Sequence, residues 1–547
     1  MINEKGLKNN NILTVALVIL VSVILFFLFI YLPQQTFPAD DALILFRYSE
    51  NLAQTGVISY NPGGSPVEGA TDFLWMVLLA GFSWCGFTVW SGALVLSCLS
   101  LLGTGFLVYR LLGAQNKNIF LLILLFLLFS VTNLSSIVGF STSFFGFFIA
   151  LTIYLDIKNK SKLVFITALI TCLIRPDGLV CVVPVIAHTI IRNRHTIWRT
   201  STQCLLLFFV PGMIYFLWRW NYFGMFFPLS FYVKNSNLLF NYQSFLVNLR
   251  FNVPFFIALA FMATCFFYKK KKVNVQWIIF YWVLFLTPFL FYSKVTLLQN
   301  VHYRFQHPFV IINLLIMALI CKSHAMKKYF IVCLTGLILF SLPLVYAGGL
   351  NMWFGKYHSL YHIARSISDR LIDARFVTTE AGIVPYYTNW RTVDAFGLNT
   401  PAFTNKVITI QDMREIRPDV VHINYMWTFY DFFDDLQETP EFSIKSWPGM
   451  IHNISKGLSK EEYDIWMIPV YDLESLCRDR LFKYNKRRVD FMPYYDMMYY
   501  CFFIRKDFAR RQEIVDIISS YNAVSYDIFK KDIRPVLEKK ARGFNFL

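Results

Sequence analysis

ILTVALVILVSVILFFLFIYL, residues 12–32, decides the fold class, because these 21 residues contain no charged side chain. A helix needs about 20 apolar residues to cross the ~30 Å hydrocarbon core of a bilayer. The stretch is therefore long enough to span a membrane. The residues that follow, Pro33, Gln34 and Gln35, do not form a small-residue cleavage site. The sequence thus predicts a retained signal anchor rather than a cleaved signal peptide.

Ten further apolar runs lie before residue 350, which gives about eleven predicted membrane-spanning helices. These runs are residues 91–112, 119–132, 140–155, 163–174, 179–191, 202–220, 253–267, 275–291, 308–321 and 329–346. Residues 71–87 are also apolar. Counting them as a span would move every later loop to the opposite side of the membrane and reverse the distribution of basic residues. We predict an interfacial or re-entrant helix there.

The composition excludes a soluble enzyme. Hydrophobic residues make up 56% of the chain and charged residues 16%, with a mean hydropathy of +0.48, whereas about a quarter of the residues in a soluble domain are charged. Residues 1–350 contain 24 basic and 8 acidic residues, and 17 of those bases fall in alternate loops. This is the positive-inside pattern. The positive charge therefore reflects membrane topology and not a nucleic-acid partner, and the N-terminus is predicted to be cytoplasmic.

The tail has the composition of a soluble domain, with 27 basic and 26 acidic residues after residue 350. We therefore predict a membrane domain at residues 1–347, with an external catalytic loop at 33–88, and an extracytoplasmic α/β domain at 348–547. Strand-like runs at 375–379, 392–395, 420–424, 465–470 and 498–504 alternate with helix-like stretches at 363–371 and 510–519. The predicted location is the cytoplasmic (inner) membrane. Cys477 and Cys501 share the external tail, where a disulfide is permitted but not required.

Five of the eight acids in the membrane part gather in the loop after the first span: Asp40, Asp41, Glu50, Glu68 and Asp72. Asp40 and Asp41 precede a helical pattern that starts at Ala42 and ends at Gly56, so Asp40 is predicted as the N-cap and Gly56 as the C′ residue. Paired carboxylates at a membrane surface suit either a general base or the ligands of a divalent cation, the candidate cofactor here. Capping alone is the alternative role of Asp40.

Five groups of residues, in order along the chain, resemble a family of GT-C type membrane glycosyltransferases. Its best-known members are the terminal arabinofuranosyltransferases of actinobacterial cell walls, and relatives glycosylate bacterial pilins. The matching residues are Asp40, Asp41, Phe46, Arg47, Tyr48, Tyr60, Asn61, Pro62, Gly63, Glu68 and Gly69; Arg175, Pro176 and Asp177; Arg219, Tyr222, Gly224 and Lys234; Arg304, Phe305 and Pro308; and Ala381, Gly382, Pro385, Tyr386, Asp394 and Gly397.

The resemblance implies transfer of a sugar, such as arabinofuranose, from a polyprenyl-phosphate donor. The acceptor would be a hydroxyl of a glycan, a lipid or a pilin-like protein on the outer face, and membrane lipids would surround the enzyme. The chain departs from the family pattern at Ser141, where the family has a carboxylate, and at Leu229 and Ser230, where it has Asn and Thr.

A lipid-phosphate leaving group needs fixed positive charge, and Arg219, Lys234 and Arg304 are the predicted donor-phosphate residues, with His302 assisting. Asp41 or Asp40 would take the acceptor proton, giving inversion in one displacement. Supporting or acceptor-binding candidates are Arg47, Glu68, Arg175, Asp177, Tyr222, Glu380 and Tyr386. The structural alternatives are bases that snorkel to lipid headgroups and an Arg175–Asp177 salt bridge that stabilises a turn.

Two other functions compete with this one. A polytopic transporter or lipid flippase would bury paired ionisable groups near the bilayer midplane, whereas the predicted spans put nearly all of them at one face. A non-enzymatic assembly factor that used the tail as a binding module would not need the acidic loop.

Overall fold

The structure, a computed structural model, describes residues 2–234, 241–268, 275–295, 297, 300–322, 326–355, 358–426, 446–471 and 498–536. The chain divides into two compact units. The membrane unit contains residues 1–38, 71–224 and 237–353. The extramembrane unit contains residues 39–70, 225–236 and 354–547. The predicted domain boundary at residues 347 and 348, where the composition becomes that of a soluble domain, therefore lies near only one of the junctions between the two units, the one after residue 353.

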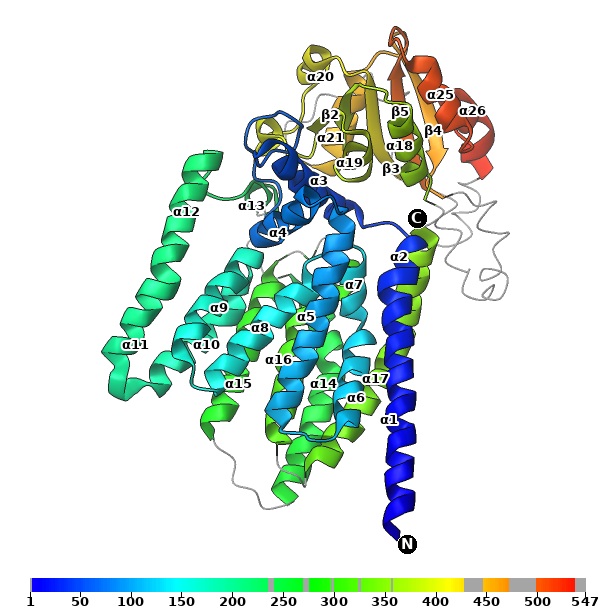
Figure 1. Ribbon diagram of the computed structural model, residues 1–547. Coiled ribbons are helices and arrows are strands. Elements are labelled where there is room, and N and C mark those ends of the chain that lie inside the picture. Colours follow the sequence, from blue (N-terminus) through cyan, green and yellow to red (C-terminus); the bar gives the residue numbers. More distant parts are fainter. Residues whose placement is uncertain are drawn as a thin grey trace. The chain divides into compact units, whose positions relative to one another are not determined.

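The membrane unit is a bundle of helices (Figure 1). Its elements are α1 (Ile2–Phe26), η1 (Phe27–Tyr31), α2 (Leu32–Gln34), α4 (Phe73–Trp84), α5 (Val89–Leu112), α6 (Lys117–Leu128), η2 (Val131–Asn133), α7 (Leu134–Ile137), α8 (Thr142–Ile157), α9 (Ser161–Ile174), α10 (Gly178–Arg192), η3 (Arg194–Thr196), α11 (Ile197–Cys204), η4 (Leu205–Phe209), α12 (Val210–Phe223), α14 (Tyr242–Tyr268), α15 (Val275–Lys294), η5 (Val301–Gln306), α16 (His307–Ile320) and α17 (Lys327–Gly355). α5, α8 and α16 pack against one another.

Six helices in the described part of the chain are long and apolar enough to cross a membrane, or seven if the bent pair of α6 with η2 and α7 forms one span. Five shorter apolar helices, of 10 to 17 residues, accompany them. Every predicted span coincides with a helix, but several of these helices are too short to count by length alone. Residues 71–87 form the short helix α4, from Phe73 to Trp84.

The extramembrane unit begins with α3 (Asp40–Thr55) and the turn after it. Gly56 caps α3 in the left-handed conformation with φ 71°, which confirms its prediction as the C′ residue. The N-cap prediction is wrong by one position. Ala39 is the extended cap residue, and Asp40 is the first helical residue. The Asp40 carboxylate accepts a hydrogen bond from the N–H of Ile383, outside the helix.

The tail of this unit is a six-stranded mixed sheet in the order β2-β1-β3-β5-β4-β6. The strands are β1 (Arg375–Thr378), β2 (Arg391–Asp394), β3 (Val420–Met426), β4 (Tyr463–Pro469), β5 (Met498–Arg505) and β6 (Val524–Ser525). β2, β1 and β3 are parallel, whereas β5, β4 and β6 pair antiparallel. All five predicted strands are present. The sequence did not predict β6, which has only two residues.

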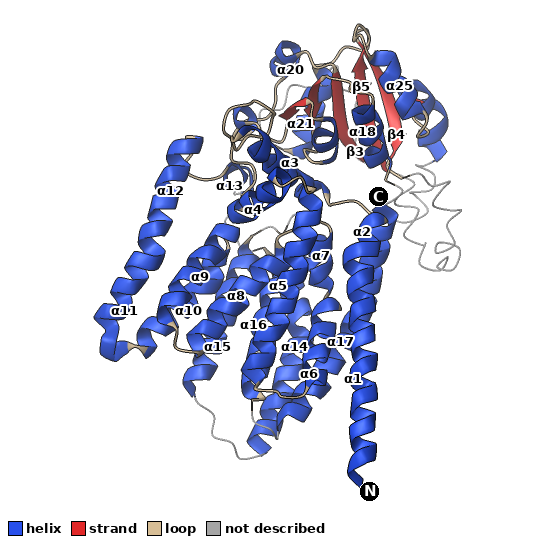
Figure 2. Cartoon of the chain, in the orientation of Figure 1, coloured by secondary structure: helices blue, strands red, loops and turns tan. Residues whose placement is uncertain are grey.

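Helices cover both faces of the sheet (Figure 2). They are α18 (Ser359–Asp369), α19 (Ile383–Thr388), α20 (Ile410–Ile416), α21 (Trp447–Lys456), α25 (Arg511–Ser519) and α26 (Tyr526–Ile528), with η7 (Pro401–Phe403) and η9 (Phe529–Ile533). One face buries Val377, Val421 and Phe503 with Met413 of α20 and Ile454 of α21. Alternate strand residues face the other side, against which α18 and α25 pack. α13 (Leu229–Lys234) belongs to the same unit.

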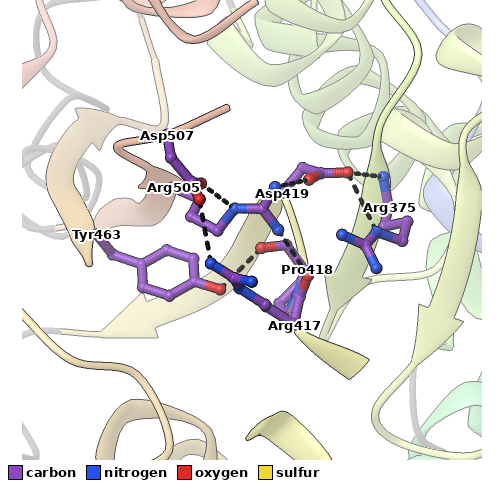
Figure 3. Close-up of polar contacts among 7 residues, drawn as sticks. All are labelled: Arg375, Arg417, Pro418, Asp419, Tyr463, Arg505 and Asp507. Atoms are coloured by element: carbon purple, nitrogen blue, oxygen red, sulfur yellow. Dashed lines mark hydrogen bonds and ion pairs between the residues drawn. The ribbon is translucent and has the colours of Figure 1, made fainter. Parts of the chain in front are cut away.

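An ion-pair network lies at the amino ends of the parallel strands (Figure 3). Asp419, just before β3, accepts the N–H of Arg375 at 2.7 Å and pairs with Arg505 at 2.7 Å. Arg505 also bonds the carbonyl of Arg417 at 2.9 Å and pairs with Asp507. The network joins β1, β3 and β5. It therefore fixes the strand register at the amino ends of β1 and β3, the end of the sheet opposite to their carboxyl ends. Cys501 is buried in β5, and Cys477 lies outside the described residues.

Candidate active site

Asp40 of α3 lies against the loop that follows β1. Its Oδ1 accepts the N–H of Ile383 at 2.7 Å. A Cβ on Gly382 would come within 2.5 Å of the same oxygen, so only glycine permits this approach. Gly382 was part of the resemblance, and its role is thus steric. The first turn of α3 and the first turn of α19 are held together at the Asp40 carboxylate.

Glu380 brings a third carboxylate to the two at the start of α3. It follows β1, and its Oε1 accepts a bond from Nδ2 of Asn424 in the neighbouring parallel strand β3 at 2.9 Å. The Asn424 N–H in turn bonds the hydroxyl of Thr379 at 3.0 Å. The carboxyl ends of parallel strands are the usual place for ligand sites in α/β sheets. Asp40, Asp41 and Glu380 are all half-buried, so each retains some access to solvent.

The three carboxylates repel one another electrostatically. Burial raises the pKa of Asp40 well above its usual range, and the charges of Glu380 and Asp41 raise it further. Burial raises the pKa of Glu380 to about 7, opposed by the hydrogen bond from Asn424 and aided by the charge of Asp41. Near neutral pH the cluster therefore retains a proton on Asp40 or on Glu380. Such an arrangement suits proton transfer.

The raised pKa of Glu380 predicts a pH dependence of stability. The unfolded group ionises near 4.5 and the folded group at about 7, so the folded state binds more protons between these values. Stability should fall as pH rises from 4.5 to about 7 and then level off. In the Glu380→Gln variant this fall should be smaller. Hydrogen exchange of the β1 and β3 amides, corrected for its intrinsic pH dependence, measures the effect. Glu415→Gln on the exposed face of α20 is the control, and an equal fall in all three proteins would contradict the prediction.

Two predicted supporting residues are occupied by contacts within the protein. Arg47 is only 1% exposed, and its guanidinium donates to the carbonyls of Tyr60 and Trp390 at 2.5 and 2.7 Å and to that of Pro385. Tyr386 donates its hydroxyl to Glu50 at 2.6 Å. Both contacts join α3 to the segment around α19. In the structure these side chains position the acidic helix.

Glu68 is buried, and its backbone carbonyl accepts the N–H of Leu229 at 3.2 Å. This bond ties the start of α13 to the segment that carries Glu68. Lys234 is the last residue of the same helix, and the structure describes its backbone only. Of the predicted donor-phosphate residues, Lys234 is the one that belongs to the extramembrane unit.

In the membrane unit, Arg175 and Asp177 form a bidentate pair at 2.9 and 2.7 Å. Tyr292 donates its hydroxyl to the same Asp177 carboxylate at 2.7 Å. This is the salt bridge considered as the structural alternative for the turn. The Arg175 guanidinium is therefore already neutralised by a protein carboxylate.

Ser141 stands where the resembled family has a carboxylate, and the carboxylate of Asp72 lies beside it. The Ser141 hydroxyl donates to Oδ2 of Asp72 at 2.6 Å. Burial raises the pKa of Asp72, and the charges of Arg175 and Arg304 oppose this rise. A carboxyl group from the segment before α4 thus lies at residue 141. The sequence carried no signal for this pairing, because the two residues are 69 positions apart.

Arg304 lies in η5 with its guanidinium 4.0 Å from the centre of the Phe140 ring and 5.0 Å from that of Phe305. Arg175 stacks on the same Phe305 ring at 5.3 Å. The structure thus gathers Arg175, Arg304 and Asp72 in one place. Asp72 was in the acidic loop, but it was not among the predicted site residues.

The other predicted residues of the membrane unit lie on two elements. His302 and Tyr303 in η5 have φ of 50° and 57°, a strained conformation for residues other than glycine. Arg219 of α12 is 4% exposed and lies over Phe216 at 5.7 Å. Tyr222, also on α12, stacks on Trp218 at 5.2 Å.

No group of three or more His, Cys, Asp or Glu residues within the described ranges has a geometry that would hold a metal ion. Asp40 and Asp41, the predicted ligands of a divalent cation, are both described. Oδ1 of Asp40 accepts the N–H of Ile383, as given above.

The architecture defines a class of protein: a polytopic α-helical membrane protein with an α/β domain. A structure search relates the chain to ArnT from Cupriavidus metallidurans bound to undecaprenyl phosphate, with a TM-score of 0.53 and 11% identity over 74% of this chain and 93% of ArnT. The likeness shows that the chain has the GT-C-like fold of ArnT. Apo ArnT from the same organism matches with a TM-score of 0.48 and 13% identity over 77% of this chain and 93% of that one.

Residues 351–495 match a family model described as a domain of unknown function (DUF8728). No curated protein matches the chain.

Proposed function

We propose that the protein is an inverting glycosyltransferase that moves a sugar from a polyprenyl-phosphate donor to a hydroxyl acceptor. One observation carries the proposal: Asp40, Asp41 and Glu380 form a half-buried acidic cluster where the start of α3 meets the loop after β1. The GT-C-like fold supports this class of reaction. The undecaprenyl phosphate bound to ArnT supports a polyprenyl-phosphate donor, and arabinofuranose is the sugar suggested by the resemblance.

In the proposed reaction the acceptor oxygen attacks the anomeric carbon while the bond from that carbon to the phosphate oxygen breaks. The electron pair leaves with polyprenyl phosphate, and the hydroxyl proton passes to the Asp41 carboxylate. We assign the base to Asp41 because its negative charge raises the pKa of both Asp40 and Glu380. A proton on Asp40 or on Glu380 lowers the negative charge that the three carboxylates present to the incoming substrate. No covalent sugar–enzyme intermediate is needed.

Arg304 is the proposed ligand of the donor phosphate. Arg304 is only 8% exposed and its guanidinium lies on aromatic rings, whereas Arg175 is paired with Asp177. A buried guanidinium stabilises developing phosphate charge more strongly than an exposed one, because little water screens it. Arg219, Lys234 and His302 remain secondary candidates for the same phosphate, and the protein would act as an enzyme of the inner membrane.

Reconstitution tests the proposal. Purified full-length protein in proteoliposomes would be incubated with radiolabelled arabinofuranosyl and hexosyl polyprenyl-phosphate donors and with glycan, lipid and pilin-like acceptors. We expect release of polyprenyl phosphate in equal amount to the sugar transferred. Labelled donor that remains intact with every acceptor would reject the transferase in favour of the transporter or the assembly factor.

Replacing Arg304 by Ala should lower the rate of transfer about 100-fold, because the leaving phosphate loses a preorganised positive charge. Arg304→Lys should recover part of this rate, since it keeps the charge but not the planar fork. Initial rates at saturating acceptor measure both. Arg250→Ala, which removes an exposed base of α14, is the matched control. Equal rates for the Arg304 and Arg250 variants would contradict the assignment.

A further inference from the structure

The extramembrane unit contains a polar cavity with a volume of about 500 Å³. Its lining does not include Asp40, Asp41 or Glu380. The turn at residues 60–67 forms one wall. The opposite wall comes from the tail and includes Asp373, Asn389, Arg391 and Thr400. The cavity therefore lies beside β2, the strand at one edge of the sheet.

On the side of β2 that faces this cavity, the backbone groups of Thr392 already have hydrogen-bond partners. The side-chain amide of Asn61 accepts the N–H of Thr392 at 2.9 Å and donates to the carbonyl of the same residue at 2.9 Å. These are the two groups through which an added peptide strand would pair with β2. The ligand of this cavity is therefore not an extended peptide that joins the sheet at Thr392.

The wall that carries Asn61 is held by a buried charge. Arg47 donates to Oδ1 of Asn61 at 3.1 Å and to the backbone carbonyl of Tyr60 at 2.5 Å. Gly63 has a φ of 65°, which permits the tight turn of the wall. The cavity is thus preorganised by the same guanidinium that holds α3 to α19.

The lining suits a neutral ligand rich in hydroxyl groups. Asp373, Asn389 and Arg391 are exposed, and together they supply acceptors, donors and both signs of charge. Thr400 accepts the N–H of Asp394 at 2.9 Å, which leaves its own hydroxyl proton available for donation. The rings of Pro62 and Pro401 add apolar surface. A sugar presents this combination of hydroxyl groups and C–H faces, whereas an anionic or purely apolar ligand would leave one of the two charges or most of the polar groups unmatched.

One side chain connects the cavity to the carboxylates. Tyr60 lines the cavity, and its hydroxyl donates to the carbonyl of Ala381 at 2.6 Å. Ala381 precedes Gly382, against which Asp40 packs. From this juxtaposition we infer that the cavity is a subsite for a saccharide unit of the acceptor. The inference rests on the proposed function and deepens it, because it makes the acceptor a glycan.

Binding of glycans by the full-length protein in detergent tests the subsite separately from transfer. The probe is an array of immobilised pentose and hexose oligosaccharides. We expect the wild type to bind at least one of them. Ser65→Trp, which fills the cavity from an exposed position, and Arg391→Ala, which removes hydrogen bonds to the ligand, should each weaken that binding about tenfold. Ser519→Trp, on the exposed surface of α25, should leave it unchanged.

The two failures can be told apart. If the wild type transfers sugar but binds no oligosaccharide, or if both cavity variants bind as the wild type does, the subsite is overturned and the proposed function stands. If glycans bind with the expected pattern but no sugar is transferred from any polyprenyl-phosphate donor, the transferase is overturned. Thermal unfolding of Ser65→Trp and Arg391→Ala separates a blocked cavity from a misfolded unit.

Discussion

Replacing Asp41 by Asn is expected to reduce sugar transfer about 10³-fold, which is within the range contributed by a general base. The amide has nearly the shape of the carboxylate but cannot accept the acceptor proton. Donor binding should be unchanged, because the substitution leaves the arginines of the membrane unit intact. Measurement of single-turnover transfer with saturating donor isolates the chemical step.

The pH profile sharpens this test. Removing the Asp41 charge should lower the pKa of Asp40 and of Glu380, since that charge raises both. The stability change between pH 4.5 and about 7 should therefore shift to lower pH in Asp41→Asn. Asp369→Asn, at the exposed end of α18, is the control for a lost surface carboxylate. If the Asp41 variant transferred sugar at the rate of the Asp369 variant, the base would have to be another group.

The carboxylate pair at the start of α3 could be predicted from sequence because both members are neighbours in the chain. Asp40 and Asp41 stand before a clear helical pattern, and Gly56 marks its end. The strands of the tail were predictable for a similar reason, since a run such as 498–504 shows its β propensity within a few residues. Local signals identified these elements, although they misplaced the N-cap of α3 by one residue.

Contacts between distant segments could not be predicted in the same way. Asn424 meets Glu380 because β1 and β3 are adjacent parallel strands, and the hydroxyl of Ser141 meets the Asp72 carboxylate across 69 positions of sequence. No local sequence pattern predicts either of these two contacts. Arg47 was expected to support the acceptor, but burial of its guanidinium among backbone carbonyls depends on where α19 and β2 lie. Membership of residues 39–70 in the same unit as the tail follows from such contacts and not from composition.

Replacing Arg47 by Met is expected to destabilise the extramembrane unit by about 4 kcal/mol, because unsatisfied buried carbonyls each cost about 1–3 kcal/mol. The methionine fills most of the space and lacks every donor. Three backbone carbonyls, of Tyr60, Pro385 and Trp390, would lose their partner at once. Asn61 would lose the contact that orients its amide toward Thr392.

Limited proteolysis and hydrogen exchange would show whether α3, α19 and β2 open together in this variant. Arg47→Lys should recover little, because a single ammonium cannot reach carbonyls on three segments as the fork does. Arg414→Met on the exposed face of α20 is the matched control, and Asp419→Asn weakens the opposite end of the sheet without touching α3. Since α3 carries Asp40 and Asp41, transfer should fall in step with the opening of this helix. A stable Arg47→Met protein with full protection of α3 would show that packing of Phe46 and Tyr48, rather than the guanidinium, holds the acidic helix in place.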